Sequence, residues 1–507
     1  MADQNFNLYA QFSNVFETQA DDVLLITDSE KKYSYADVDK ESARLANFLT
    51  ASGVQAGDRV SVQVEKSPAA LCLYLACLRA GFAFHPLNTG YQSAELAYFF
   101  GNAEPAAVIC DSGTLNTIAP LVKELNIPHL FTLDADGSGT LIDQSRQSGD
   151  AYILVSRASD DIAALLYSSG TTGQPKGIVL THNNLYENAR TLVGAWGFTE
   201  DDVLLHALPI FHVHGLFVAL GCVLLSGASM RWLATFNTDK VVEYLPECTS
   251  MMGVPTYYTR LLTAENFTRE SAAQIRLFIS GSAPLLEETF YEFEKRCGHR
   301  ILERYGMSET NMNTSNPLKG ERKPGTVGPP LPGVEVRITD DAGSVLETGE
   351  IGNLQVRGGN VFREYWKMPE KTVEDFSDDG FFNTGDKGVI DVDGYVSIVG
   401  RSKDMIISGG LNIYPIEIEG VLNDLADVKE SAVIGVPHAD FGEGVVAVIV
   451  CTVGASLEED QVIRETKEKI ASFKVPKRVV FIEKLPRNTM GKVQKNLLRE
   501  SYKDLLQ

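Results

Sequence analysis

The stretch LLYSSGTTGQPKGIVLTH, residues 165–182, sets hydroxyl side chains, glycines and one lysine directly after a short apolar run. The run at 163–167 predicts a strand that leads into a loop. Glycines leave the backbone of such a loop free to curl, so that hydroxyl and N–H groups can surround a polyphosphate. Lys176 would add one positive charge. A flexible loop that only joins two elements is the alternative interpretation.

This loop does not fit the Walker A pattern. That pattern requires GxxxxGK[ST], with the lysine at the start of a helix. Here Pro175 stands directly before Lys176, and Gly177 follows it. The loop is therefore expected to hold phosphate in a different way from the P-loop of nucleotide hydrolases.

The composition of the chain excludes several classes of partner. The chain has 507 residues, 44% of them hydrophobic and 22% charged, and its formal net charge is −22. This length predicts two or three structural units. A strongly acidic chain repels nucleic acid and anionic membrane surfaces, so neither is expected as a partner. An anionic substrate would have to meet cations that are concentrated locally.

The sequence predicts a cytoplasmic protein. Its seven cysteines are scattered and odd in number, which favours reduced thiols. The N-terminus lacks the basic and apolar regions of a secretory signal. Residues 208–230 contain no Asp, Glu, Lys or Arg, but their dense apolar part is shorter than the roughly 20 residues that a membrane span needs. We expect a buried helix there and no integral membrane association.

Hydrophobic periodicity predicts an α/β fold with α+β layers. Ser34 and Asp37 have capping-box spacing at the start of an amphipathic segment that ends at Gly53. Helical segments and short apolar strands alternate to about residue 310, which predicts layered sheets and helices. Short alternating segments after residue 320 predict a small antiparallel β unit. We place the large N-terminal domain at 1–400 and a small, mobile C-terminal α/β domain at 401–507.

Six blocks of the sequence resemble the adenylate-forming superfamily, which includes acyl-CoA synthetases, luciferase-like enzymes and peptide-synthetase adenylation domains. The likeness covers essentially the whole chain, and the blocks follow in the family's order. They are YSSGTTGQPKG (167–177), GSAPL (281–285), ERYGMSET (303–310), FFNTGDKG (381–388), GRSKDMIISGGLNIYPIEIE (400–419) and PRNTMGK (486–492).

The resemblance implies a two-step reaction with ATP and coenzyme A as cosubstrates and Mg²⁺ as cofactor. A substrate carboxylate attacks the α-phosphate of ATP, which gives an acyl-adenylate and pyrophosphate, and the thiol of coenzyme A then takes the acyl group. The catalytic residues implied are Lys492, Thr171 and Glu309, with Glu309 also the metal ligand. The nucleotide-binding residues implied are Ser168, Ser169, Gly170, Thr172, Lys176, Gly281, Ser282, Ala283, Glu303, Tyr305, Gly306, Ser308, Asp386 and Arg401.

Several of these residues have a specific role in the family. Tyr305 would stack on adenine, and Asp386 would accept hydrogen bonds from the ribose hydroxyls. Lys492 would bridge the acyl carboxylate and the α-phosphate in the transition state. Lys403 matches the hinge on which the C-terminal domain rotates between the two steps, and Gly410 matches the glycine that lines the coenzyme A channel.

The acyl side of the sequence carries cations among apolar and aromatic neighbours: His212, His214, Arg260 and Arg304. A buried cation is costly unless an anion compensates it, and a second substrate carboxylate would do so. A surface arginine paired with an acid such as Glu265 is the alternative for Arg260, and an internal ion pair is the alternative for Arg304.

The segments that carry these residues resemble the malonyl-CoA synthetases of the superfamily: ALPIFHVHGLF (207–217), MGVPTYYTRLL (252–262) and ERYGMSETNMNTSNP (303–317). The resemblance implies a dicarboxylic acid substrate, malonate, with methylmalonate as a second candidate. A synthetase for another acid, such as a medium-chain fatty acid, is the main alternative. A carrier-coupled adenylation module and an inactive nucleotide-binding scaffold are the others. The partners implied are small molecules: the dicarboxylic acid, ATP and coenzyme A.

Overall fold

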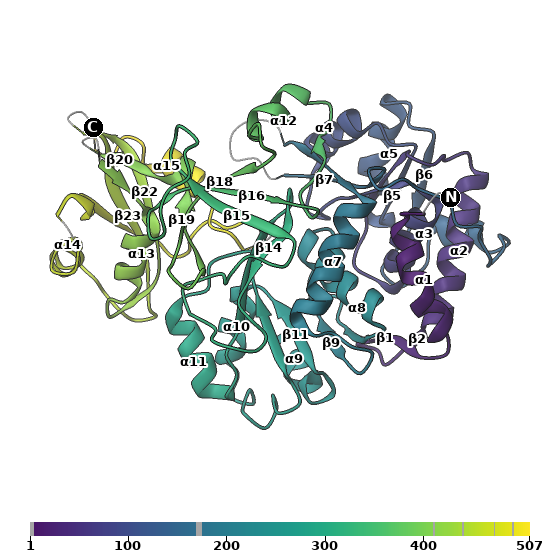
Figure 1. Ribbon diagram of the computed structural model, residues 1–507, viewed down its shortest axis with the longest axis horizontal. Helices are drawn as coiled ribbons and strands as arrows, with labels where there is room; N and C mark the ends of the chain where they lie inside the picture. The colour runs from purple at the N-terminus through teal and green to yellow at the C-terminus, as the bar shows by residue number, and fades with distance from the viewer. Residues whose placement is uncertain are drawn as a thin grey trace. The chain divides into compact units, whose positions relative to one another are not determined.

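The computed structural model describes residues 5–168, 175–408, 411–438, 441–470, 472–488 and 491–506. The chain forms two compact units. The larger unit contains residues 1–324, 328–335 and 357–380, and the smaller unit contains 325–327, 336–356 and 381–507. The smaller unit therefore includes both the C-terminal part of the chain and most of the β segment that precedes residue 400 (Figure 1).

The larger unit contains two sheets whose central strands run parallel. The eight-stranded sheet has the order β14-β13-β12-β11-β9-β10-β1-β2, and only the pairs β13–β14 and β1–β2 are antiparallel. Its strands are β1 (Val23–Thr27), β2 (Lys32–Ser34), β9 (Val203–His206), β10 (Ser229–Trp232), β11 (Ser250–Gly253), β12 (Leu277–Ser280), β13 (Leu302–Met307) and β14 (Asn311–Ser315).

The seven-stranded sheet has the order β17-β8-β7-β4-β3-β5-β6, with β7, β8 and β17 paired antiparallel at one edge. Its strands are β3 (Arg59–Gln63), β4 (Ala83–Pro86), β5 (Ala107–Cys110), β6 (His129–Thr132), β7 (Ile162–Tyr167), β8 (Gly177–Thr181) and β17 (Glu364–Tyr365). The phosphate-loop candidate connects β7 to β8, so its lysine precedes a strand. This arrangement differs from the strand–loop–helix of a P-loop, as the failed Walker pattern predicts.

Helices of the larger unit pack on these sheets; α1 contacts α3, α7 and α8, and α7 contacts α8 (Figure 1). The helices are α1 (Leu8–Thr18), α2 (Tyr35–Ala51), α3 (Pro68–Ala80), α4 (Ser93–Ala103), α5 (Leu115–Glu124), α6 (Thr140–Ser145), α7 (His182–Trp196), α8 (Leu220–Ser226), α9 (Thr238–Tyr244), α10 (Pro255–Leu262), α11 (Glu287–Cys297) and α12 (Pro369–Asp375). Short helical turns are η1 (Ser112–Thr114), the π-helix η2 (His214–Ala219) and η3 (Leu245–Glu247).

The smaller unit contains a four-stranded and a five-stranded sheet. The first has the order β15-β16-β18-β19, and the second has the order β21-β20-β23-β22 with β24 paired to β23. The elements are β15 (Val334–Thr339), β16 (Gly352–Gly358), β18 (Phe382–Ile390), β19 (Val396–Arg401), η4 (Ser402–Asp404), β20 (Ile406–Ser408), β21 (Leu411–Ile413), α13 (Pro415–Asn423), β22 (Val428–His438), β23 (Gly442–Cys451), α14 (Glu459–Lys467), η5 (Ser472–Lys474), β24 (Arg478–Phe481) and α15 (Lys495–Tyr502).

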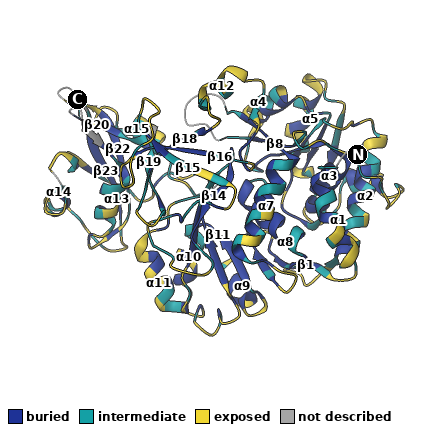
Figure 2. Ribbon diagram, viewed as in Figure 1, coloured by how far each residue is buried: buried dark blue, intermediate teal, exposed yellow. Residues whose placement is uncertain are grey.

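The predicted α/β fold class is confirmed, and several local predictions hold with it. Ser34 caps α2: its hydroxyl accepts from the Asp37 N–H, and the Asp37 carboxylate accepts from the Ser34 N–H. The β segment after residue 320 forms antiparallel pairs between β16, β18 and β19. Central strands are buried along their length, and exposed positions gather on the helices and turns (Figure 2). Six cysteines are buried and Cys451 is half-buried, all as free thiols.

The uncharged segment 208–230 contains the buried helix that the sequence predicts, over residues 214–226. It begins as the π-helix η2 and continues into α8, which ends at Gly227 in a left-handed conformation. Gly215 explains the irregular start, because a Cβ there would lie 2.0 Å from the carbonyl oxygen of Pro209. Within the described ranges, no helix combines the length and apolar composition needed to cross a bilayer.

Gly306 fixes the approach of β13 to β14, and its substitution should show this. A Cβ at Gly306 would lie 1.8 Å from the carbonyl oxygen of Asn311. We expect Gly306→Ala to lower the free energy of unfolding by about 2–3 kcal/mol, because the two strands must separate. Urea unfolding followed by circular dichroism measures this change.

The matched control is Gly194→Ala in α7, where a Cβ meets nothing within 4 Å. Alanine is favoured over glycine by about 1 kcal/mol inside a helix, so this variant should be at least as stable as the wild type. Equal stability of Gly306→Ala and the wild type would contradict the packing described here.

Candidate active site

The acyl-side and adenine-side residues gather at the carboxyl ends of adjacent parallel strands. His206, the last residue of β9, is in register with Met252 of β11, and Gly253 is in register with Ser280 of β12. Ser280 is in turn in register with Glu303 of β13. The segments that follow these strands therefore meet at one sheet edge, where ligands of parallel α/β sheets characteristically bind.

Arg304 is buried at this edge with part of its guanidinium unsatisfied. The residue is 3% exposed, and its Nε and Nη2 donate to no partner among the described residues. The guanidinium lies against the backbone of Gly281, where a Cβ would be 2.4 Å from Cζ. Burial lowers the pKa of Arg304 to about 10, which still leaves it protonated at neutral pH. A buried cation with free donors is suited to an anion.

His214 lies beside the same position at the start of η2. Its Nδ1 is 3.4 Å from the hydroxyl of Ser282, and its Nε2 has no described partner. Burial, followed by the charge of Arg304, lowers the pKa of His214 well below its usual value, so the ring is neutral. Ser282 has φ +72°, a conformation that a serine adopts at a free-energy cost. His212 lies two residues before η2, with its ring against that of Phe211.

Glu303 is a buried carboxyl group on the strand that carries Arg304. It is 7% exposed, and Oε1 accepts from the Leu285 N–H at 3.2 Å. Burial raises the pKa of Glu303 to about 8, against the smaller opposing effects of the Leu285 N–H and Arg304. Neighbouring residues of a strand point to opposite faces, so Glu303 does not pair with Arg304. The carboxyl group is neutral at pH 7 and leaves the arginine uncompensated.

Arg260 is in a different environment from Arg304. It lies near the C-terminal end of α10, is exposed, and its guanidinium carbon is 6.0 Å from the centre of the Phe236 ring. The Phe236 ring stacks on Tyr257, with ring centroids 4.0 Å apart. No contact between Arg260 and Glu265 is found among the described interactions, so the surface ion pair considered from sequence is not formed.

The ends of the phosphate-loop candidate are held together. The Ser168 N–H donates to the Lys176 carbonyl at 3.0 Å, and the Lys176 N–H donates to the Ser168 hydroxyl at 3.3 Å. The hydroxyl of Tyr98 donates to the Pro175 carbonyl at 2.6 Å. Four predicted loop residues lie outside the described residues: Ser169, Gly170, Thr171 and Thr172. The hinge-region Gly410 lies outside them as well.

The side chain of Lys176 contacts residues that sequence analysis did not single out. Its Nζ lies 3.5 Å from Asp375 Oδ2 and 4.1 Å from the centre of the Tyr365 ring. The hydroxyl of Tyr365 lies 3.5 Å from Glu309 Oε1. The candidate phosphate lysine and the candidate metal ligand are thus joined through one buried tyrosine. Strand pairing between β17 and β8 produces this arrangement, and no local motif signals it.

The remaining adenine-side residues lie on β13, in the turn after β13, and in the segment after β12. Tyr305 and Gly306 lie on β13, and Ser308 and Glu309 lie in the turn that follows. Ala283 is half-buried in the segment after β12. Glu309 is 6% exposed, and its carbonyl accepts from the Phe362 N–H at 2.7 Å. Within the described residues, no group of three or more His, Cys, Asp or Glu side chains could hold a metal ion alone.

The smaller unit carries the predicted ribose pair on adjacent strands. Asp386 of β18 is in register with Arg401 of β19, and Arg401 Nε lies 2.6 Å from Asp386 Oδ1. Lys403 follows in η4 and is exposed. Asp404 is paired to Arg499 at 2.7 Å, which fixes this turn to α15.

Lys492 lies in the smaller unit and is bonded to Asn488. Its N–H donates to the Asn488 side chain at 2.9 Å, and its carbonyl accepts from the Asn488 N–H at 2.9 Å. Gly491 has φ +74°, which favours glycine at that position. Lys492 is exposed.

Sequence analysis also missed a buried lysine beneath the acyl side. Lys66 is 7% exposed, and its Nζ donates to His206 Nδ1 at 2.8 Å and to the carbonyls of His206 and Leu233. It also lies over the ring of Trp232 at 4.3 Å. Because His206 Nε2 donates to the Gly215 carbonyl at 2.9 Å, Nδ1 must accept. Lys66 thus tethers η2 through His206.

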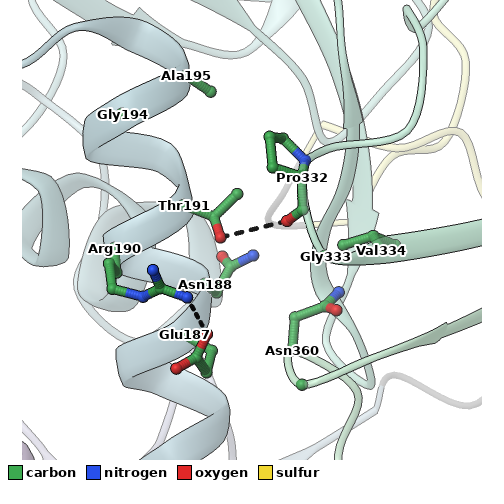
Figure 3. Close-up of a pocket in the computed structure, with 11 residues that line it drawn as sticks. Glu187, Asn188, Arg190, Thr191, Gly194, Ala195, Pro332, Gly333, Val334 and Asn360 are labelled. Carbon is green, nitrogen blue, oxygen red and sulfur yellow. Dashed lines mark hydrogen bonds and ion pairs between the residues drawn. The ribbon is translucent and has the colours of Figure 1, made fainter.

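A groove of about 420 Å³ lies elsewhere in the larger unit, between α7 and the segments around Pro332 and Asn360 (Figure 3). The hydroxyl of Thr191 donates across it to the Pro332 carbonyl at 3.4 Å, and Arg190 pairs with Glu187 on its rim. None of the residues predicted from sequence lines this groove.

Comparison with known proteins identifies the family. Residues 12–366 match the AMP-binding enzyme family, and residues 417–492 match the AMP-binding enzyme C-terminal domain. The chain belongs to the AMP-binding enzyme family. The resemblance to adenylate-forming enzymes is therefore confirmed.

Individual relatives of this AMP-binding enzyme cover nearly its whole length. It is 34% identical to the malonate–CoA ligase of Arabidopsis thaliana, over 95% of this chain and 87% of the relative. It is also 34% identical to the mitochondrial malonate–CoA ligase of Homo sapiens, over 94% of this chain and 89% of the relative.

Solved structures agree with these relatives. ATP-bound MatB from Rhodopseudomonas palustris is 51% identical, has a TM-score of 0.96, and is matched over 99% of this chain and 100% of that one. A benzoate CoA ligase from Burkholderia xenovorans LB400 is 28% identical, with a TM-score of 0.88 and coverage of 98% and 100%.

The Lys66 tether predicts a destabilised and mispositioned acyl side in Lys66→Met. Methionine would leave His206 Nδ1 and the Leu233 carbonyl without their donor, at a cost of about 3 kcal/mol in the free energy of unfolding, whereas the His206 carbonyl would keep the Leu233 N–H. Urea unfolding measures the loss. The control is Lys31→Met, an exposed lysine over the Tyr33 ring, which should change stability by less than about 0.5 kcal/mol. Equal effects of the two variants would contradict the tether.

The buried Glu303 predicts a stability that falls as pH rises. The unfolded carboxyl group loses its proton near pH 4.5 and the folded one near pH 8, so the unfolded state binds fewer protons between these values. The contribution of this group is full below about pH 4.5 and is lost as pH rises through about 8. Glu303→Gln should remove the part of the pH-dependent fall in the free energy of unfolding that this carboxyl group causes.

Urea midpoints from about pH 5 to about pH 8 provide the measurement. Glu288→Gln, which alters an exposed carboxylate in the first turn of α11 that is not among the charges acting on Glu303, should keep the wild-type slope. An unchanged slope in Glu303→Gln would show that Glu303 is ionised in the folded protein.

Proposed function

We propose that this protein is an AMP-forming malonate–CoA ligase. It activates malonate with ATP to malonyl-adenylate and transfers the malonyl group to coenzyme A, giving malonyl-CoA, AMP and pyrophosphate. The observation that carries the proposal is the buried Arg304 guanidinium, which has two unsatisfied nitrogens at the acyl-side sheet edge. A fatty-acid pocket needs only apolar walls, whereas this site needs an anion. The named malonate–CoA ligase relatives support the same choice.

In the proposed complex Arg304 binds the carboxylate that does not react. The guanidinium is planar and can meet a carboxylate with two parallel hydrogen bonds. Its orientation is fixed by the face of Gly281, and the neutral Glu303 does not compete for it. His214, neutral and close to Ser282, would contribute a further hydrogen bond. Arg260 remains a second candidate, although its exposure makes its charge less effective.

The first half-reaction joins two anions, so positioning and positive charge supply most of the catalysis. Lys176 and the hydroxyls of the phosphate loop are the proposed phosphate ligands, and Asp386 with Arg401 is the proposed ribose site. We assign Lys492 the bridge between the attacking carboxylate and the α-phosphate. The backbone of Lys492 is bonded to Asn488, which suits that role.

The proposed Mg²⁺ site rests on Glu309. Mg²⁺ is usually held by one or two carboxylates together with substrate phosphates and water, so a three-residue cluster is not required. Glu309 is a buried carboxylate joined through Tyr365 to the phosphate lysine, and this donor set fits such an ion. When bound, the ion would neutralise phosphate charge and orient the nucleotide.

For the second half-reaction we propose attack of the coenzyme A thiol on the malonyl-adenylate. The thiol sulfur forms a bond to the malonyl carbonyl carbon, and the bond from that carbon to the phosphate oxygen of AMP breaks. We retain the hinge at Lys403, the channel at Gly410 and a boundary near residue 400 as part of the proposal. The proposed compartment is the cytosol, where the thiols stay reduced.

An acid panel with ATP and coenzyme A tests the proposal. AMP release is measured with malonate, methylmalonate, propionate and octanoate. We expect malonate to give the highest kcat/KM. In Arg304→Met the kcat/KM for malonate should fall at least about 100-fold, because the second carboxylate loses its charged partner, while propionate should change by less than about fivefold.

Arg260→Met is the matched control, since it removes the same charge from an exposed position. We expect a smaller loss for malonate than in Arg304→Met. Turnover of octanoate at or above that of malonate would defeat the proposed substrate, and an unchanged malonate KM in Arg304→Met would defeat the proposed role of the arginine.

A further inference from the structure

Lys176 is paired within its own unit rather than exposed to solvent. Its Nζ lies 3.5 Å from Asp375 Oδ2, and both side chains are half-buried. The other oxygen of the carboxylate, Oδ1, is 2.9 Å from the Nζ of Lys371. Asp375 therefore holds two lysines, and the bond to Lys176 is the longer of the two.

The aspartate is brought there by two elements that fold back onto the loop strands. β17 pairs with β8, and this places Tyr365 opposite Ile178, two residues after Lys176. α12 follows and is fixed to β17, because the Tyr365 N–H donates to the Thr372 hydroxyl at 2.9 Å. Asp375 is the last residue of that helix.

Tyr365 supplies the surface on which the lysine rests. It is 2% exposed, its ring face meets the ammonium at 4.1 Å, and its hydroxyl points to Glu309. Burial, followed by the charges of Glu309 and Asp375, raises the pKa of Tyr365 far above its usual value. The phenol stays protonated and donates to Glu309, so the ring cannot take over the anionic role of Asp375.

We propose that Asp375 is a resident carboxylate that holds Lys176 in the ATP-free protein and is exchanged for nucleotide phosphate when ATP binds. This inference rests on the proposed function, because it takes Lys176 as a phosphate ligand. Carboxylate and phosphate oxygens are equivalent acceptors for an ammonium group. Charge-assisted N–H···O bonds are normally about 2.7–2.9 Å, so a separation of 3.5 Å marks a loose pair that can be exchanged.

Lys371 makes the exchange favourable. When Lys176 turns to phosphate, Asp375 keeps its 2.9 Å partner and is not left as an unpaired carboxylate. Asp375 is thus a positioning residue that acts through Lys176. While ATP is absent it orients the ammonium, and on ATP binding it competes with the triphosphate.

Calorimetric titration of Mg-ATP, without any acid, tests this competition. We expect Asp375→Asn to bind Mg-ATP about three- to tenfold more tightly than the wild type, because the competing charge is gone and Lys176 is released. The matched control is Glu374→Gln, which changes an exposed carboxylate one residue away that pairs with Lys371. Its Kd should stay within about 1.5-fold of the wild-type value.

A double-mutant cycle shows whether the effect passes through Lys176. Asp375→Asn should have no effect on the Kd when it is made in the Lys176→Met background. Asp375→Glu, which keeps the charge, should return the Kd to near the wild-type value, and it also provides a reading if Asp375→Asn folds poorly. Unchanged or weaker binding by Asp375→Asn, or the same tightening in both backgrounds, would overturn the inference.

This titration is separable from the test of the proposed function. ATP binding needs no acid, so the cycle reports on Asp375 even if malonate releases no AMP. A normal acid panel with no coupling between positions 375 and 176 would reject the inference alone. The expected coupling without malonate turnover would reject the proposed substrate alone.

Discussion

A guanidinium buried without a carboxylate beside it is the constraint on which the acyl side of this protein depends. Arg304 is enclosed at the carboxyl ends of the parallel strands, yet two of its nitrogens have no acceptor among the described residues. Leaving such a group unpaired costs several kcal/mol in the free energy of folding unless a ligand completes it. The surroundings keep the charge available: Glu303 is neutral, His214 is neutral, and Gly281 offers a flat face in place of a side chain.

On the nucleotide side the cations are paired, in contrast to the unpaired Arg304. Its candidate cations are already paired with carboxylates of the same unit: Lys176 with Asp375, and Arg401 with Asp386. These pairs are partly exposed, so each contributes little to stability. In a chain with a net charge of −22, pairing also keeps the few cations of the site from being drawn to other acidic groups. In the proposed complex the nucleotide would therefore exchange partners with the paired cations, whereas the second carboxylate of the acid would complete the unpaired Arg304.

Local patterns explain which parts of the fold could be predicted. The Ser34–Asp37 capping box, the apolar strands and the failed Walker pattern are all set by neighbours in sequence, and the structure agrees with each. The π-helix at 214–219 was not predicted, because it depends on the contact of Gly215 with Pro209 and on the Lys66–His206 tether. That tether joins residues 140 positions apart, so no window of sequence reveals it.

The residues of the candidate site also fall into two groups: those that local sequence could indicate and those that only long-range contacts bring together. Residues carried by contiguous blocks, such as Gly281, Arg304 and Glu309, could be singled out from the resemblance, and the structure brings them to one sheet edge. Asp375 and Tyr365 could not, because only the pairing of β17 with β8 brings them to Lys176. The state of Arg304 was also open in the sequence, since an internal ion pair and a ligand site have the same residue pattern. The burial of Arg304 and the absence of a described acceptor for two of its nitrogens favour the ligand site over the internal ion pair.

The contact between Gly281 and Arg304 also constrains how substrate preference could evolve. Position 281 has ordinary backbone angles, so alanine is conformationally permitted there, but its methyl group would occupy the space of the guanidinium. A methyl group at position 281 could thus displace the Arg304 guanidinium although residue 304 itself is unchanged. Under the proposed role of Arg304, descendants of this enzyme would lose their preference for a doubly charged acid through a net gain of one carbon and two hydrogens, and reversion at a single site would restore it.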